Sequence, residues 1–358
     1  PITFRDFMDT ALYDPEFGYY NTERLKIGPT GDYYTSSNVH AAFGAILANA
    51  FVDLWPVRPL ALVEIGAGSG QLALDILTAL RDEHASVFAQ TSYRIVETSP
   101  AMRARQREKL SSFGNQVSWN QIQDLDRIEG IIFSNEVVDA MPVHRIKISD
   151  SGITELFVAT AESIGPDFDP VRPRVAGGLV SDPELLLAWR QPSSHRLEDY
   201  VRSIKIRLTE GQRVEANLDA LDWLTQMAQA LANGLLITID YGDIAPHLYG
   251  PDRRAGTFRC FYNHRLVDDP LERIGEQDMT ASVNFTALTE HGATLGLETL
   301  SYERQSAFLM RNGLIERMEA MQDPTGSMEE MKDRLALKNL FVPGGASDNF
   351  RVLIQRKV

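Results

Sequence analysis

The stretch Leu60-Ala-Leu-Val-Glu-Ile-Gly-Ala-Gly-Ser-Gly70 decides the fold class of this 358-residue chain. Its first six residues form a short, mostly apolar run, which is typical of a strand buried in a parallel sheet. Three glycines at alternate positions then permit a sharp turn. Apolar side chains recur after the turn with helical spacing, at Leu72, Ile76, Leu77 and Leu80. The stretch therefore predicts a strand, a glycine loop and a helix whose free N–H groups point at a ligand.

Apolar runs and helical patterns keep alternating after this stretch. We expect further strands at residues 93–97, 117–119, 130–133 and 235–239. The helix before the last of these has its expected apolar face at Leu218, Leu221, Leu224, Met227 and Leu231, with Gly234 as its cap. Strand and helix repeated in this way predict an α/β fold with a doubly wound, Rossmann-like sheet.

The rhythm breaks after the fourth strand, and this break defines the domain organisation. Glycine and proline crowd one segment, at Gly165, Pro166, Pro170, Pro173, Gly177 and Gly178, which indicates loops. We therefore expect an N-terminal helical cap (1–58), a core (59–150 and 216–358) with substrate-side elements near its C-terminus, and an inserted subdomain (151–215). Beyond the fifth strand we expect an irregular stretch to Val283, a helix from Phe285, a strand at Leu297–Tyr302, a helix over 328–340 and a last strand at Phe350, Val352 and Ile354.

The composition excludes several classes of protein. Lys and Arg number 35 against 49 Asp and Glu, and the net charge of −14 argues against a protein that binds nucleic acid phosphates. The longest uncharged stretch, Tyr33 to Val52, is too polar to span a membrane. The single cysteine, Cys260, cannot form an internal disulfide and is expected to be a small buried side chain, which favours a reducing compartment. The seven histidines lack metal-ligand spacing, so we expect no metal, and any targeting peptide would lie upstream of Pro1.

The glycine loop is the predicted cofactor site, because ligands of open α/β sheets bind at the carboxyl ends of the strands. A dinucleotide fingerprint, G-x-G-x-x-G/A, fails when it starts at Gly66 and passes only when it starts at Gly68. The alternating form Glu64-x-Gly66-x-Gly68-x-Gly70 is instead the version that S-adenosylmethionine enzymes use. Glu97 follows the second strand, 27 residues after Gly70, and is expected to bind the ribose hydroxyls. Asp124 and Leu125 follow the third strand, where an acid commonly reaches the adenine amino group.

The predicted catalytic group follows the fourth strand, at Asn135, Glu136 and Asp139. Two carboxylates three residues apart can share one face of a helical turn, where they would orient a guanidinium or ammonium group and stay near its departing protons. The alternative is a capping asparagine with two solvated acids. The N-P-P-[YF] set of adenine and glutamine N-methyltransferases is absent at this place. Asp240 and Tyr241 end the fifth strand and are weaker candidates for the substrate cleft.

Longer motifs extend these local signals over nearly the whole chain. They are Ile2-Thr-Phe-Arg-Asp-Phe-Met8, Tyr13-Asp-Pro-Glu-Phe-Gly-Tyr-Tyr20, Gly31-Asp-Tyr-Tyr-Thr-Ser36, Glu64–Gly70, Ser134-Asn-Glu-Val-Val-Asp-Ala-Met-Pro-Val-His144, Asp240–Gly242, Gly256-Thr-Phe-Arg-Cys-Phe-Tyr262 and Asp278-Met-Thr-Ala-Ser-Val-Asn-Phe285. With these motifs the chain resembles the MidA-type family of S-adenosylmethionine-dependent methyltransferases. That family includes the mitochondrial assembly factor of respiratory complex I that methylates a protein arginine.

The resemblance implies a class I methyltransferase fold with S-adenosylmethionine as cofactor and an arginine-bearing protein as substrate. It implies that Gly31, Asp32, Thr35 and Ser36 form a loop over the cofactor, and that Arg259 and Tyr241 line the substrate cleft. The expected location is the cytoplasm for a bacterial protein and the mitochondrial matrix for a eukaryotic one. The chain departs from the family at Ser37, where Pro is usual, and at Ser282 and Asn284, where His and Asp are usual. If that His and Asp serve the substrate, the departures imply another substrate or weak activity.

Two other functions compete with a protein arginine methyltransferase that serves the assembly of a respiratory complex or a similar partner. One is an assembly factor or chaperone that binds S-adenosylmethionine with little catalysis, which the departures at Ser282 and Asn284 favour. The other is an NAD-dependent oxidoreductase, which the fingerprint starting at Gly68 favours.

Overall fold

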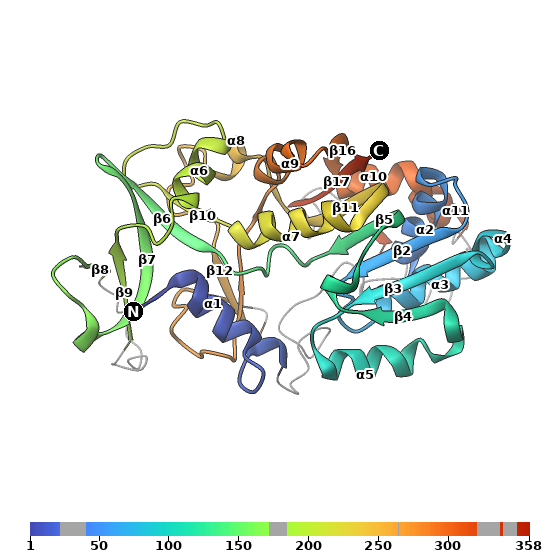
Figure 1. Cartoon of the computed structure of the whole chain (residues 1–358), viewed down its shortest axis with the longest axis horizontal. Helices are drawn as coiled ribbons and strands as arrows, with labels where there is room; N and C mark the ends of the chain where they lie inside the picture. Colours follow the sequence, from blue (N-terminus) through green and yellow to red (C-terminus); the bar gives the residue numbers. More distant parts are fainter. Residues whose placement is uncertain (22–40, 172–184, 264, 321–336, 339–348) are drawn as a thin grey trace.

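The computed structural model describes residues 1–21, 41–171, 185–263, 265–320, 337–338 and 349–358. Its largest element is an eight-stranded sheet with the order β16-β17-β11-β5-β2-β3-β4 and with β15 beside β11 (Figure 1). The strands are β2 (Leu60–Ile65), β3 (Thr91–Val96), β4 (Val117–Asn120), β5 (Ile128–Asn135), β11 (Leu231–Asp243), β15 (Val283–Asn284), β16 (Glu298–Arg304) and β17 (Phe350–Lys357). The five core strands from β4 to β11 run parallel, whereas β17 runs antiparallel to its neighbours. The predicted doubly wound sheet is confirmed.

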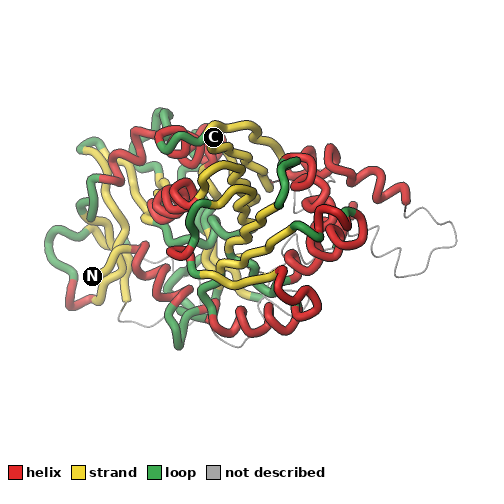
Figure 2. The backbone as a smooth tube through the Cα atoms, turned by 45° about the vertical axis from the view of Figure 1, so that its right-hand side comes forward, coloured by secondary structure: helices red, strands yellow, loops and turns green. Residues whose placement is uncertain are grey.

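Helices cover both faces of this sheet, and Figure 2 shows them on both sides of the strand layer. Alternate residues of a strand face opposite ways, so Leu62 of β2 packs on one side and Val63 on the other. The first side holds α2 (Ala42–Leu54), α3 (Gln71–Glu83) and α10 (Gln305–Leu309), and the second holds α7 (Leu218–Ala230) and α9 (Phe285–Thr294). The same part of the chain also contains α4 (Ala85–Phe88), α5 (Pro100–Lys109) and α11 (Ile315–Ala320). None of the described helices is long and apolar enough to cross a membrane.

A second, antiparallel sheet stands beside the first, on the left of Figure 1. Its strands are β1 (Ile2–Thr3), β6 (His144–Ser149), β7 (Gly152–Thr160), β8 (Asp169–Pro170), β9 (Leu185–Arg190) and β10 (Arg213–Ala216). The proposed insertion, residues 151–215, supplies most of this sheet, while β1 and β6 come from outside it. Helices α1 (Phe4–Tyr13), α6 (Arg196–Ser203) and α8 (Ala245–Leu248) accompany it. The described part of the proposed N-terminal cap thus places α1 against the second sheet and α2 against α3.

A small three-stranded sheet, β13-β12-β14, packs against α1. Its strands are β12 (Arg259–Tyr262), β13 (Arg265–Val267) and β14 (Asp278–Thr280). The sequence predicted an irregular stretch here, and that prediction is wrong because strands of three and four residues carry too little periodicity to be recognised.

Other local predictions fare differently. The helix from Phe285, the strand near Leu297–Tyr302 and the last strand are confirmed as α9, β16 and β17. Gly234 does not cap α7, because the helix ends at Ala230 and Gly234 lies inside β11. The predicted helix over 328–340 falls almost entirely outside the described residues, as do Pro173, Gly177 and Gly178.

Strands β2, β5 and β11 approach one another closely at Gly130 and Gly234, and this close packing should matter for stability. Gly130 pairs with Ala61 on one side and Gly234 on the other, and a Cβ at Gly130 would lie 2.2 Å from the Ala61 carbonyl oxygen. Gly130→Ala should lower the free energy of unfolding by about 3 kcal/mol or more, since backbone atoms of a central strand must move. The matched control is Gly152→Ala, where the new Cβ has no atom within 4 Å. Only the strain of its backbone angle (φ 129°) should lower the free energy of unfolding there, by about 1 kcal/mol. Equal losses in urea unfolding of the two variants would contradict this account.

Candidate active site

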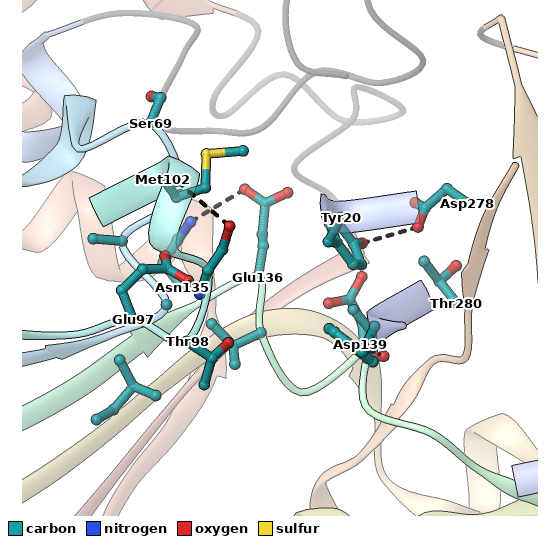
Figure 3. A pocket seen from close by; sticks show the side chains of 18 of the residues that line it. Tyr20, Ser69, Glu97, Thr98, Met102, Asn135, Glu136, Asp139, Asp278 and Thr280 are labelled. Atoms are coloured by element: carbon teal, nitrogen blue, oxygen red, sulfur yellow. Dashed lines mark hydrogen bonds between the residues drawn. The ribbon is translucent and has the colours of Figure 1, made fainter. Parts of the chain in front are cut away.

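A cavity of about 1020 Å³ opens at the carboxyl ends of β2, β3, β5 and β11. One half is lined by residues that follow β2 and β3, among them Gly66, Gly68, Ser69, Glu97, Thr98 and Met102. The other half is lined by Tyr13, Tyr20, Asp139, Tyr241, Arg259, Phe261, Asp278 and Thr280. Glu136 stands between the two groups (Figure 3). The structure therefore brings together most of the residues that the sequence predicted for cofactor and acceptor.

The glycine loop turns in the conformation that its sequence requires. Gly66, Gly68 and Gly70 have φ of 68°, 51° and 74°, in the left-handed region that favours glycine. A Cβ at Gly66 would lie 2.8 Å from Cγ2 of Val137, so the loop also needs a small residue to fit under the β5 loop. Helix α3 begins directly after Gly70 and points its first N–H groups toward the cavity end of the sheet. Glu64 lies below the loop, where burial raises the pKa of its carboxyl to about 8. The hydrogen bond that Tyr93 Oη donates to it (2.7 Å) has the opposite effect on this pKa but is the smaller of the two.

Glu97 is fixed at the end of β3 by three neighbours. Its Oε1 accepts a hydrogen bond from the backbone N of Ser99 (3.0 Å), and its Oε2 accepts one from Gln106 Nε2 (3.1 Å). Arg103 donates to the Glu97 carbonyl oxygen from Nε and Nη2. Burial raises the pKa of Glu97, while the hydrogen bonds from Ser99 and Gln106 oppose that shift. A carboxylate has about four acceptor positions, so two remain for the hydroxyls of a ligand.

Gln106 is a site residue that the sequence analysis missed. It lies on α5, is fully buried, and uses its whole amide. Its Nε2 donates to Gly68 O (2.8 Å) as well as to Glu97, and its Oε1 accepts from Trp119 Nε1 (3.0 Å). A single side chain thus ties the glycine loop, the acid after β3 and strand β4 together.

Three described residues that were predicted for the cofactor, Gly70, Asp124 and Leu125, do not line the cavity. Asp124 is exposed and its Oδ2 accepts from the backbone N of Gln121 (3.2 Å), while Leu125 is buried in the core. Neither lines the cavity, although Ile122 of the same turn does. Thr35 and Ser36, with Gly31 and Asp32 of the same predicted loop, fall outside the described residues.

The loop after β5 carries the predicted catalytic group. Asn135 Nδ2 donates to Glu136 Oε1 (3.2 Å), and Glu136 adopts a φ of 55°, which is uncommon for a residue other than glycine. Asp139 is buried, and its Oδ1 has no hydrogen-bond partner among the described residues. Asn135 Oδ1 is likewise buried without such a partner. Buried polar atoms of this kind are rare unless a ligand or water completes them.

Asp240 supports this loop from behind and does not line the cavity. Its Oδ2 accepts from the backbone N of Val137, Val138 and Asp139 at 3.2, 2.9 and 3.3 Å. Burial and the charge of Glu136 raise the pKa of Asp240 to about 7, although these backbone N–H groups oppose the shift. Asp240 therefore acts on the substrate only through the loop that it holds.

The acceptor half of the cavity is rich in carboxylates and phenols. Tyr20 Oη donates to Asp278 Oδ1 (2.9 Å), Tyr13 Oη donates to the carbonyl oxygen of Ala140 (2.9 Å), and Tyr241 Oη bonds to Thr280 Oγ1. Figure 3 shows Asp139 close below Tyr20, on the same side as Asp278 and Thr280. Burial, with the charges of Asp240 and Asp278, raises the pKa of Asp139 well above its usual range. Such a site favours a cationic ligand, because a positive charge relieves the repulsion between these acids.

Comparison with known proteins identifies the family. The model of a family described as "Putative S-adenosyl-L-methionine-dependent methyltransferase" matches residues 46–303. This chain belongs to that family. A Burkholderia thailandensis protein crystallised with S-adenosyl-homocysteine is 29% identical, with a TM-score of 0.83 over 99% of this chain and 88% of its own. "Protein arginine methyltransferase NDUFAF7, mitochondrial" is 27% identical both in Danio rerio and in Homo sapiens, over 90% of this chain and 75% and 72% of theirs.

The chain is thus an S-adenosylmethionine-dependent methyltransferase of the α/β class that the sequence predicted, and the alternative of an NAD-dependent oxidoreductase is wrong. The residues of the first half of the cavity fit this cofactor. The loop at Gly66 leaves no room for a Cβ, so a ligand can approach its backbone closely. Glu97 retains acceptor positions for ribose hydroxyls, and Asn135 Oδ1 is a buried acceptor without a partner among the described residues. We infer that Gly66, Gly68 and Glu97 hold the cofactor there.

Two of the three departures from the family, Ser282 and Asn284, lie outside the cavity lining, and the third, Ser37, falls outside the described residues. Asn284 caps α9, accepting from the backbone N of Ala287 (3.3 Å), and its Nδ2 donates to Tyr200 Oη (3.1 Å). Ser282 also does not line the cavity. These positions therefore give little reason to expect a loss of catalysis.

Glu97 should contribute strongly to cofactor affinity, whereas Asp124 should not. Glu97→Ala removes two charge-assisted hydrogen bonds to the ribose, each worth about 1.5–3 kcal/mol, so S-adenosylhomocysteine binding should weaken at least tenfold in calorimetry. Asp124→Ala, which removes an exposed carboxylate of similar size, should change the affinity less than about twofold. If the two variants bind equally well, Glu97 does not belong to the site.

Gln106 should matter for binding without touching the ligand. Gln106→Leu keeps the volume but frees the Gly68 carbonyl and the Glu97 carboxylate, so affinity for S-adenosylhomocysteine should fall about tenfold. Gln123→Leu, at an exposed glutamine beside the cavity residue Ile122, is the matched control. A folded Gln106→Leu protein with wild-type affinity would refute this positioning role.

Proposed function

We propose that this methyltransferase methylates a guanidinium nitrogen of a protein arginine. The observation that supports this most is the carboxylate wall of the acceptor half, formed by Glu136, Asp139 and Asp278. The names of the NDUFAF7 relatives, which are protein arginine methyltransferases, agree with it. A guanidinium offers five N–H donors in one plane, and closely spaced carboxylates are the groups that bind it most strongly.

The side chains that line the cavity would have different roles in methyl transfer. S-adenosylmethionine, when bound, supplies a methyl group on a sulfonium that is already activated for displacement. Glu136, between the two halves, would orient the guanidinium and localise its charge on the far nitrogens. Asp139, whose pKa is raised and whose Oδ1 is unpartnered among the described residues, would accept one N–H and stay near the departing proton. The phenols of Tyr13, Tyr20 and Tyr241 would keep the acids apart from bulk water.

The names of the relatives also support proposals for the partner and the compartment. We propose that the substrate is a protein of a respiratory complex or of a similar assembly. The relatives are named as mitochondrial proteins, so we propose the mitochondrial matrix if this chain is eukaryotic and the cytoplasm if it is bacterial. A factor that binds the cofactor but transfers nothing is the outcome to be distinguished by experiment.

Charge removal at the acceptor wall tests the proposed chemistry. Glu136→Gln and Asp139→Asn should each lower methyl transfer by about 10²-fold, the usual size of lost acid–base help, with S-adenosylhomocysteine affinity changed less than about threefold. Transfer is measured with labelled S-adenosylmethionine on a lysate that lacks the gene, followed by amino-acid analysis for methylarginine. The control pair is Ser282→His and Asn284→Asp, which restore the usual family residues outside the cavity and should leave the rate within about twofold.

Each other result has a defined meaning. Label on a residue other than arginine would keep the methyltransferase but reject the arginine substrate. Wild-type rates in the double variant with both acids neutralised would remove Glu136 and Asp139 from the chemistry. Cofactor binding without any transfer by the wild-type protein would favour the non-catalytic assembly factor.

A further inference from the structure

The sheet formed by β12, β13 and β14 has two faces with different surroundings. Successive residues of a strand point to opposite faces, and residues paired across strands share a face. Cys260 pairs with Val267 and with Met279, and all three pack in the core with α1. The other face, which we call the outer face, carries Arg259, Phe261, Leu266, Asp278 and Thr280, because Phe261 pairs with Leu266 and Asp278 while Arg259 pairs with Thr280.

The outer face is continuous with the acceptor half of the cavity. Arg259, Phe261, Asp278 and Thr280 all line the cavity. Leu266 extends the same face one strand further, on β13, which among the described strands bonds only to β12. Its side chain is 60% exposed, although it is large and apolar and lies beside Phe261. The cavity thus runs out onto an apolar surface where a polypeptide can continue beyond the reacting group.

Arg259 gives the outer face a positively charged end. It is exposed, and no ion pair or hydrogen bond joins its guanidinium to another described residue. The other charged side chains that line the cavity are the acids Glu64, Glu97, Glu136, Asp139 and Asp278. A cation that binds none of these acids is positioned to meet an acid on an incoming partner.

We propose that the outer face binds the polypeptide segment around the target arginine, with an acidic side chain against Arg259 and an apolar side chain on Phe261 and Leu266. This inference rests on the proposed function and adds a sequence preference to it. Two residues along β12 span about 6.6 Å, and the step to β13 adds about 5 Å, so Arg259 and Leu266 are roughly 8 Å apart.

That spacing fits an extended segment whose acidic and apolar residues are two positions apart. The residue between them points away from the outer face. In this arrangement the arginine faces the side of the cavity where Glu136 stands, between the cofactor residues and Tyr20 (Figure 3). The flanking residues thus contact the outer face, while the guanidinium points away from it toward Glu136.

Peptides with one arginine test this preference directly. The set places Asp, Ala or Lys on one side of the arginine and Leu or Ser on the other, in both orders, and transfer from labelled S-adenosylmethionine gives kcat/KM for each. The wild-type protein should prefer an acidic over a basic neighbour at least threefold and Leu over Ser about tenfold, as expected from an exposed ion pair and a buried leucine.

The variants are chosen so that misfolding cannot imitate the result. Arg259→Glu should turn the preference from Asp to Lys, a gain that an unfolded protein cannot show. Leu266→Glu and the milder Leu266→Ser should remove the preference for Leu, whereas Leu300→Glu, at an exposed leucine on β16, should leave both preferences unchanged. Calorimetry with S-adenosylhomocysteine checks that each variant still binds the cofactor.

The outcomes separate this inference from the proposed function. Peptide methylation with the same flanking preferences in the wild type, Arg259→Glu and Leu266→Ser overturns the docking face and leaves the arginine substrate in place. Methylation without any flanking preference in the wild type has the same meaning. Transfer to no arginine peptide at all overturns both proposals.

Discussion

The acceptor side of this enzyme depends on one buried carboxylate that never reaches the cavity. Asp240, at the end of β11, accepts hydrogen bonds from three successive backbone N–H groups of the β5 loop and from the backbone N of Tyr241. The loop needs this support, because Glu136 has a positive φ that costs roughly 1 kcal/mol or more outside glycine. Glu136 is also tied to β11 through its backbone N, which donates to the Ile239 carbonyl oxygen (2.9 Å). The register between β5 and β11 therefore sets where Glu136 and Asp139 stand.

The two halves of the cavity are built on different principles. The cofactor half uses backbone geometry and one fixed acid, with Gln106 joining them, so its shape comes from a parallel sheet that is buried on both faces. The acceptor half is assembled from α1, the β5 loop, β12 and β14, and its lining includes the carboxylates of Asp139 and Asp278. The two halves therefore come from different parts of the chain.

Local sequence signals predicted the first half well and the second half poorly. The apolar run of β2, the glycine spacing and Glu97 lie within one strand–loop–helix unit and the strand beside it, where periodicity and turn chemistry are informative. The hydrogen bond between Tyr20 and Asp278 joins residues 258 positions apart, and no local sequence pattern predicts it.

Three single residues also differ from their sequence predictions. Gln106 is not predicted as a site residue, because the arginines and the lysine around it are typical of a solvated helix. Asp124 was expected at the adenine by its position after β4, but its carboxylate instead caps its own turn at Gln121. The position of Asp240 at the end of a strand predicts a place in the cleft. Its carboxylate instead accepts hydrogen bonds from backbone N–H groups of the neighbouring β5 loop.

For the proposed arginine substrate, the raised pKa of Asp139 would link binding to proton release. Burial and the neighbouring charges of Asp240 and Asp278 favour the neutral form of this carboxyl when no cation is present. A guanidinium placed beside it favours the charged form, so the pKa must fall as the cation binds. Arrival of the positive charge therefore expels a proton, and the ionised Asp139 is ready to hold a proton again as the methylated nitrogen loses one. Without a cation the grouped acids would repel one another, so one of them keeps its proton. With the cation in place, the ionised acid can accept the proton that the substrate releases. Their close grouping therefore suits the proposed substrate, which enters charged and must lose a proton around the transfer.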